Sequence, residues 1–299
     1  MAIAPALPGP YFEPDPLLDP PPLPQPGCFA DAEVGFLASH IKSGLGNSVL
    51  VGNRASDFVQ VPVGQLDWTA SPRLEFGYRL PSGFGGFSLA YRFLATDGSN
   101  SSFGPDSVSA LRSRLDVNVV DCDYSSWEIS LWPKCEMKWR LGMRYADVFF
   151  DAQAEELFAL AAAGSGVFQR AVSNSYVGFG PHVGVELCRH LEGTGISFIG
   201  SSDFATLLGR IRQGFFETST AVGPMSRFVG GETRVYSSQA VPILNVQIGV
   251  AWQPPTCQNI QVFLGYQYEH WWTVGRLSAL GTSGELMDQG IVLRAGINF

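Results

Sequence analysis

The chain has 299 residues, of which 15% are charged and 12% aromatic, and it carries a net charge of −8. The acidic balance excludes a protein that follows nucleic-acid phosphates along a basic face, so we expect no nucleic-acid partner. No uninterrupted apolar run reaches the roughly 18–20 residues of a membrane-spanning helix, whereas a strand of a membrane barrel needs only about 9–11 residues.

The N-terminal part of the chain is rich in proline. Residues 1–28 hold ten prolines, and a residue without a backbone N–H cannot join a strand ladder. We therefore expect an extended tail over 1–28, acting as a spacer or as a ligand for a partner that binds polyproline, and a folded domain over 29–299. The opening MAIAPALPGP lacks the charged start and apolar core of a signal peptide, so the export signal is expected to be missing from this chain.

Ten segments of alternating apolar and polar residues follow the tail, and this two-residue period predicts ten strands. The predicted strands cover residues 31–39, 73–80, 87–95, 109–121, 136–150, 174–187, 196–212, 239–252, 260–272 and 287–299. One stretch, AQAEELFALAAA within 151–163, predicts a short helix in a loop, ended by Gly164.

The connections between these strands alternate in length. Most of the short ones, such as PSGFGG, CRHLEGTG and QPPTCQN, fall at one end, and the long ones fall at the other. Short turns at one end and long loops at the other are typical of transmembrane antiparallel up-and-down β-barrels. The fold class predicted is therefore all-β, with about ten strands and both chain ends on the periplasmic side.

Alternation alone fits two arrangements. A soluble barrel or sandwich points its apolar faces inward, whereas a membrane barrel points them outward to lipid and encloses the polar faces. Three features favour the membrane arrangement: the polar faces hold many arginines and few lysines, the apolar faces end in Tyr and Trp, and the chain ends on an aromatic residue that completes a strand.

The strand phases chosen on this basis predict a set of charged side chains that line the lumen. These are Glu75, Arg79, Arg92, Arg112, Arg114, Asp116, Lys138, Arg140, Arg144, His182, Glu186, Glu269 and Arg294. Bases outnumber acids in the predicted set. Either arginine–carboxylate pairs fill this narrow lumen, or a residual water path with net positive charge favours small anions.

Several stretches together resemble a known family. RSRLDVNVVDCDY, MKWRLGMRYADV, NSYVGFGPHVGVEL, VQIGVAWQP and GIVLRAGINF are similar to segments of pore-forming outer-membrane proteins related to the Legionella major outer-membrane protein, particularly its planctomycete members. The likeness covers roughly residues 29–299. It implies the outer membrane of a Gram-negative-type bacterium, a porin-like role, and Phe299 as the signal read by the barrel-assembly machinery.

Motifs for catalysis or metal binding are weak. The sequence has no paired-histidine or Cys-x-x-Cys spacing and no nucleophile elbow or phosphate loop in its required context, so we expect no metal, no cofactor and no enzymatic activity. His182 and Glu186 are interpreted as hydrogen-bonding groups of the lumen. Among the five cysteines, Cys122 and Cys135 form the best candidate disulfide, because both flank one turn on the oxidising periplasmic side.

Three functions fit these observations. The first, and the leading hypothesis, is a porin-like passive pore for small solutes. The second is a plugged structural or anchoring barrel whose surface loops mediate interactions. The third is a soluble barrel that binds a small lipophile. The partners expected for a membrane barrel are outer-membrane lipid and the barrel-assembly machinery. The fold class also allows a homo-oligomer of this chain.

Overall fold

The structure is a computed structural model of the whole chain. It describes residues 26–42, 47–50, 57–60, 65–103, 107–160, 164–191, 194–222, 228–254, 259–275 and 284–299. The predicted proline-rich tail therefore lies, apart from its last three residues, outside the described residues.

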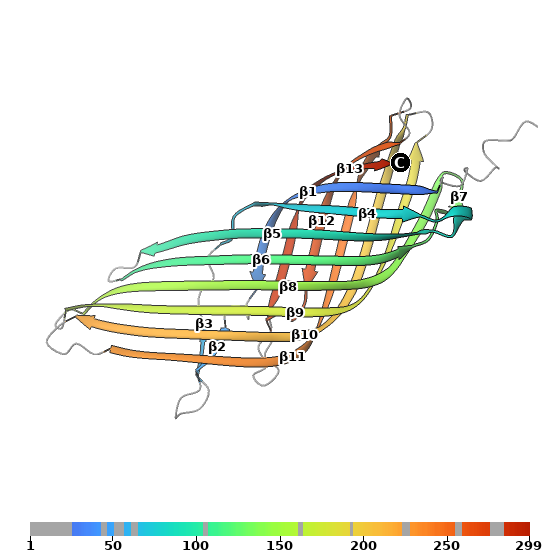
Figure 1. Cartoon of the computed structure of the whole chain (residues 1–299). Helices are drawn as coiled ribbons and strands as arrows, with labels where there is room; N and C mark the ends of the chain where they lie inside the picture. The colour runs from blue at the N-terminus through green and yellow to red at the C-terminus, as the bar shows by residue number, and fades with distance from the viewer. Residues whose placement is uncertain are drawn as a thin grey trace, which may run out of the picture.

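Ten antiparallel strands form a closed barrel (Figure 1). They are β1 (Gly27–Lys42), β4 (Thr69–Arg79), β5 (Gly86–Phe103), β6 (Ser107–Ser125), β8 (Cys135–Leu160), β9 (Gly164–Leu191), β10 (Ile196–Val222), β11 (Phe228–Trp252), β12 (Ile260–Trp271) and β13 (Glu285–Asn298). Strands adjacent in this series pair with each other, and pairing of β1 with β13 closes the ring. The predicted fold class and all ten predicted strands are confirmed.

In the described parts of the connections lie three short strands and one helical turn. β2 (Asn47–Leu50) and β3 (Asp57–Gln60) form a hairpin, β7 (Ile129–Trp132) pairs with the start of β8, and a 3₁₀ turn spans Pro81–Gly83. Within the described residues, no helix has the length and apolar character needed to cross a bilayer.

The helix predicted over 151–163 is wrong, because β8 continues as a strand to Leu160. Ala152 is buried inside the barrel, whereas Gln153 and Glu155 are exposed on its outer face. Pairing with β6 and β9 on both sides supplies the backbone hydrogen bonds of this stretch. Tertiary pairing thus overrides the helix propensity of an alanine-rich sequence.

The barrel wall has unequal height. The strands β8 to β11 have 26, 28, 27 and 25 residues, whereas β4 and β12 have 11 and 12. A strand needs only about 9–11 residues to cross a bilayer. The long strands reach well beyond the short ones at the end opposite the C-terminus (Figure 1), so one side of the barrel is much longer than a bilayer crossing requires.

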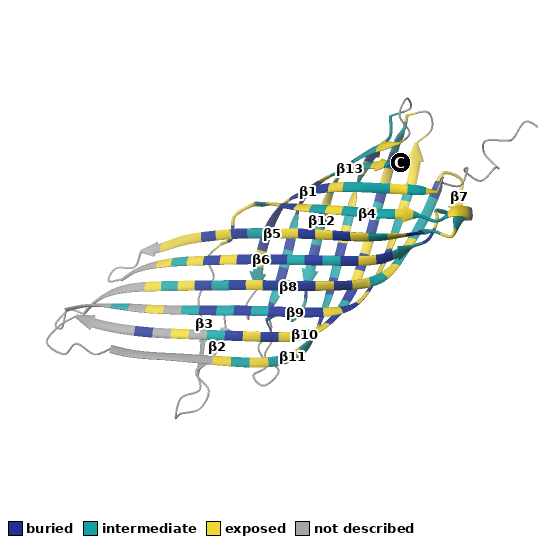
Figure 2. Cartoon of the chain, in the orientation of Figure 1, coloured by how far each residue is buried: buried dark blue, intermediate teal, exposed yellow. Residues whose placement is uncertain are grey.

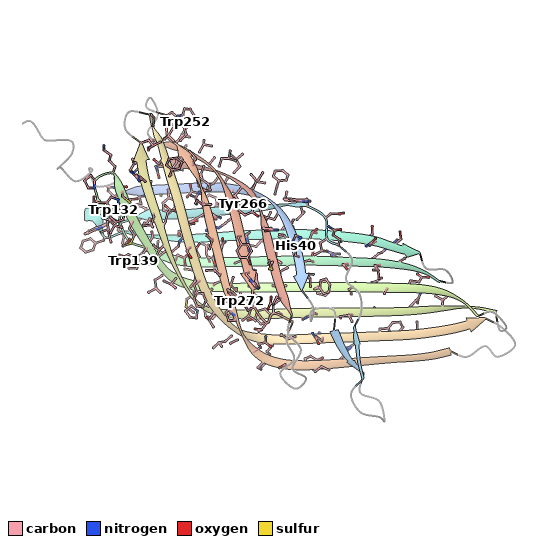
Figure 3. The ribbon with its side chains drawn as sticks, turned by 180° about the vertical axis from the view of Figure 1, so that it is seen from behind. His40, Trp132, Trp139, Trp252, Tyr266 and Trp272 are labelled. Atoms are coloured by element: carbon pink, nitrogen blue, oxygen red, sulfur yellow. The ribbon has the colours of Figure 1, made fainter. Side chains whose placement is uncertain are left out.

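An apolar band encircles the outside of the barrel near the end that holds the C-terminus. Large apolar side chains that are exposed in this band include Leu74, Phe76, Leu89, Leu141, Val183, Phe198, Ile248, Leu264, Ile291 and Leu293. More exposed residues alternate with less exposed ones along the strands that cross it (Figure 2). Trp132, Trp139 and Trp252 lie toward the end that holds the C-terminus and the short turns, which we call the turn end (Figure 3). Trp272 lies toward the opposite end, which we call the loop end. An exposed apolar band between aromatic side chains is the surface that a membrane barrel presents to lipid.

The interior is divided into two layers. Charged and amide side chains point into the layer enclosed by the apolar band. Above it, at the loop end, lies a cluster of buried apolar side chains. The cluster draws members from every barrel strand except β4, and Leu66 and Val274 join it from connecting segments.

β8 shows how the two layers arise. Its inward side chains change from Arg140 and Arg144 to Val148 and Phe150 along the strand, while its outward side chains change from Leu141 to Gln153. Along β8, the charged inward residues lie at the level of apolar outward residues, and the apolar inward residues continue to the level where the outward residues are Gln153 and Glu155. The part of the barrel beyond the band therefore has the ordinary hydrophobic core of a protein in water.

Candidate functional site

The charged layer inside the band contains most of the side chains predicted to line the lumen. The structure places ten of them on inward faces: Glu75, Arg79, Arg92, Lys138, Arg140, Arg144, His182, Glu186, Glu269 and Arg294. They come from β4, β5, β8, β9, β12 and β13, so distant parts of the chain meet in one layer.

Glu269 is the centre of this layer and is fully buried. Its carboxylate accepts hydrogen bonds from both terminal nitrogens of Arg92. It also accepts from the side-chain amides of Asn245 at 3.1 Å and Gln267 at 3.2 Å, and from the indole N–H of Trp271 at 2.5 Å. Because Trp271 belongs to the apolar cluster, Glu269 joins the two layers of the interior.

A second group of paired charges lies across the lumen on β6, β8, β9 and β10. Arg144 donates to both carboxylate oxygens of Asp121, at 2.6 and 2.9 Å. His182 lies 2.9 Å from Asp123 through Nδ1 and 3.7 Å from Asp203 through Nε2. Asp203 in turn pairs with Arg140 at 3.0 Å. The charges in this group are compensated by neighbours, as buried charges require.

Below the paired charges, a cavity of about 960 Å³ opens at the turn end of the barrel. Its charged lining includes Asp31, Glu75, Arg79, Lys138, Glu186 and Arg294. Arg294 stands 4.0 Å from Glu186, and its guanidinium lies 4.8 Å from the centre of the Phe263 ring. We refer to this cavity as the vestibule.

Three predicted lumen residues lie on the opposite face. Arg112 and Arg114 are exposed on the outside of β6, and Arg114 pairs there with Asp116 at 2.9 Å. The inward residues of this strand segment are Leu115 and Val117. The prediction assumed that charges point inward along the whole strand, but this segment lies above the apolar band, where the outside meets water.

The same reversal hid several lumen residues from the prediction. Asp121 and Asp123 share the inward phase of Leu115, and Asp203 lies on β10, where the alternation was ambiguous. Further inward charged groups are Asp31, Glu33, Arg73, Glu136 and Asp288, of which only Glu33 was predicted to face the lumen. With them, the inward acids outnumber the inward Arg and Lys residues among the described residues, so the predicted excess of positive charge is wrong.

The predicted disulfide between Cys122 and Cys135 is also contradicted, because both thiols are free. Cys122 lies opposite Met143, whereas Cys135 lies at the start of β8. A strand rises about 3.3 Å per residue, so the register separates the two cysteines by roughly 26 Å. Disulfides need Cα atoms within about 7 Å. The two residues flank β7 and its turn in sequence, but Cys122 is already well inside β6.

One group of side chains has the composition of a metal site. Ligand atoms of Asp121, Asp123 and His182 lie within 4.8 Å of one another, and all three residues are buried. Arg144 donates to both oxygens of Asp121, and it also lies 3.4 Å from His182 Nε2. A divalent cation here would face that guanidinium directly, so we assign the group to the ion-pair network.

Glycine at position 184 makes room for one of these pairs. A Cβ at Gly184 would lie 2.0 Å from the Asp203 carboxylate and 2.8 Å from Arg140 Nε. We expect Gly184→Ala to separate the Arg140–Asp203 pair and to lower the free energy of unfolding in detergent by about 1–3 kcal/mol, the usual cost of overpacking. Gly200→Ala is the matched control on β10, because nothing lies within 4 Å of its Cβ. Equal denaturation midpoints for the two variants would refute this explanation.

Comparison with known proteins agrees with the barrel fold. The chain resembles the outer membrane protease OmpT from Escherichia coli, with a TM-score of 0.50 and 13% identity over 91% of this chain and 97% of that one. It also aligns with the toluene transporter TbuX from Ralstonia pickettii, with a TM-score of 0.31 and 9% identity over 91% and 90% of the two chains. No curated protein matches the sequence. The family model described as Legionella pneumophila major outer membrane protein precursor matches residues 37–290. The chain therefore belongs to this family of outer-membrane β-barrels.

Proposed function

We propose that the protein is a closed outer-membrane barrel that serves as a structural support for its extracellular wall and loops. The supporting observation is the apolar cluster across the lumen. Phe150, Leu207, Ile243 and Leu286, from four different strands, are each 0% exposed within it. Water and ions do not cross an apolar layer packed to this extent without a rearrangement.

A porin-like passive pore for small solutes is the second candidate. The vestibule favours it, since about 960 Å³ of charged cavity leads inward from the turn end. Passage would require the Arg92–Glu269 pair and the apolar cluster above it to move apart. Packed interiors resist such continuous deformation, so we rank the closed barrel first.

Single-channel recording separates the two candidates. We expect the purified, folded protein to insert into planar bilayers without stepwise current, because the cluster blocks the ion path. Insertion would be checked by recovering protease-protected barrel from vesicles made in parallel. Discrete current steps from the wild-type chain would overturn the closed barrel and support the pore.

Catalysis is not part of this proposal. The likeness to OmpT is one of fold at 13% identity and does not transfer proteolysis.

The periplasmic position of residues 1–28, the assembly-signal role of Phe299 and any homo-oligomer stay predictions from the sequence. Phe299 is 74% exposed, and its N–H donates to the Cys28 carbonyl at 2.9 Å, which supports an accessible terminal aromatic.

A further inference from the structure

A groove on the outer surface of the long wall has a composition unlike the rest of that surface. It has a volume of about 590 Å³ and is lined by Phe149, Asp151, Ala171, Ser173, Ser175, Arg212, Gly214, Phe216 and Arg234. These residues come from β8, β9, β10 and β11, and their neighbours Phe150, Val172 and Ile211 are buried inside the barrel. We call this hollow the wall groove.

The wall groove lies just beyond the apolar band, on the loop side. Along the outer face of β9, Val183 and Val177 are exposed apolar residues, and the next outward residues are Ser175 and Ser173. Along β10, exposed Leu208 gives way to Arg212. Since long loops of such barrels face outward from the cell, the groove faces the headgroup level of the outer leaflet.

Positive charge exceeds negative charge in the lining of the wall groove, where Arg212 and Arg234 lie with one carboxylate, that of Asp151, which accepts a hydrogen bond from Gln153. The protein as a whole has a net charge of −8. In the pairing of β10 with β11, Arg212 lies opposite Tyr236. Two positions further along, Gly214 lies opposite Arg234. The two arginines are thus diagonal neighbours on one outer face, and the Cα atoms of such neighbours are roughly 7–8 Å apart. A third arginine, Arg210, is exposed on the same face of β10. Arginine side chains are long enough for two that start from such neighbouring backbone positions to bind one phosphate from both sides.

The floor and rim of the wall groove complete a site for an amphipathic molecule. Gly214 has no side chain, and a Cβ there would lie 2.7 Å from the Ser173 hydroxyl, so the floor stays open. Phe216 is 45% exposed, and Tyr236, beside Arg212, is 66% exposed with its ring centre 5.8 Å from the guanidinium. Aromatic side chains next to cationic ones are typical of the boundary between acyl chains and headgroups.

We propose that the wall groove binds the phosphate-bearing headgroup of an outer-leaflet lipid, with Arg212 and Arg234 on the phosphate and Phe149 and Phe216 against its apolar part. The position at the edge of the lipid-facing band selects a lipid over a soluble anion. This inference rests on the membrane orientation of the barrel and is independent of whether the lumen conducts.

The test compares lipids that differ only in phosphate. The folded protein in neutral detergent is titrated with a diphosphorylated glucosamine-disaccharide lipid and with the same lipid after removal of its phosphates, and binding is followed by native mass spectrometry. We expect one tightly retained phosphorylated lipid, and a Kd at least about tenfold weaker for the dephosphorylated lipid and for the double variant Arg212→Gln/Arg234→Gln. Arg189→Gln, an exposed arginine at the other end of β9, is the control and should bind like the wild type.

Three results would overturn the proposal. The double variant could bind the phosphorylated lipid as well as the wild type does. Inorganic phosphate alone could displace the lipid at equal molar amounts, which would assign the groove to a soluble anion. The double variant could instead abolish a wild-type dimer without changing lipid binding, which would assign the groove to a second copy of the chain. The resistance of each folded variant to heat in gel electrophoresis shows whether its barrel has formed.

Discussion

Replacing Glu269 by glutamine is expected to lower the free energy of unfolding by about 3–5 kcal/mol, because the change leaves the buried Arg92 guanidinium without its counter-ion. Glutamine has nearly the same volume as glutamate, so no cavity accompanies the loss of charge. The carboxylate is 0% exposed and holds Arg92 through both of its oxygens. Denaturant titration of the refolded barrel in detergent, followed by tryptophan fluorescence, measures the effect.

Two further variants make this prediction specific. Glu186→Gln removes a carboxylate that lies 4.0 Å from Arg294 in the open vestibule, where solvent screens the pair, and should cost under about 1 kcal/mol. Adding Arg92→Met to Glu269→Gln removes the stranded charge and should recover part of the lost stability. If the double variant is as unstable as the sum of its single changes, the two groups are not coupled as described.

Replacing Phe150 by alanine is expected to cost about 3–5 kcal/mol, the usual range for a fully buried phenylalanine. Its ring is 0% exposed within the apolar cluster that closes the lumen. The same change also removes volume from the layer that we propose blocks ions. We therefore expect a lower denaturation midpoint in detergent, measured as for Glu269, together with brief current steps in planar bilayers that the wild type lacks.

Phe149 is the matched control for this change, since it is the next residue on the same strand. It points outward and is 38% exposed, so Phe149→Ala should cost under about 1.5 kcal/mol and leave the bilayer silent. A destabilisation by Phe149→Ala equal to that by Phe150→Ala would contradict the strand phase on which the closed interior depends.

The strands could be predicted because their signal is local. Alternation such as Leu74, Phe76 and Tyr78 against Arg73 and Glu75 fixes an extended segment and its two faces without knowledge of its partners. The continuation of β8 to Leu160 could not be predicted, because it depends on hydrogen bonds to β6 and β9 rather than on its own composition.

The predicted lumen residues lie on inward faces only where one rule holds along the strand. At the level of the apolar band, charged side chains point into the barrel, and Arg92, Arg144 and Glu269 follow that rule. Above the band, charged side chains point out of the barrel. For this reason Arg112 and Arg114 were predicted on the wrong face and Asp121 was missed. The height at which the rule reverses is set by where lipid ends on the folded barrel. A signal was present in the strand itself, since Leu115 and Val117 continue in phase with Asp121.

The reversal of polarity along the wall can be measured directly with spin labels on outward positions. In a variant whose native cysteines are replaced by serine, single cysteines at Leu141, Gln153 and Arg114 would carry a nitroxide in lipid vesicles. The label at Leu141 should be accessible to oxygen and shielded from a water-soluble nickel chelate, and the labels at Gln153 and Arg114 should show the opposite. If the chelate cannot reach the labels at Gln153 and Arg114, those faces lie in lipid or in a sealed interior. That result would contradict a barrel that, above the membrane, has polar side chains outside and apolar side chains inside.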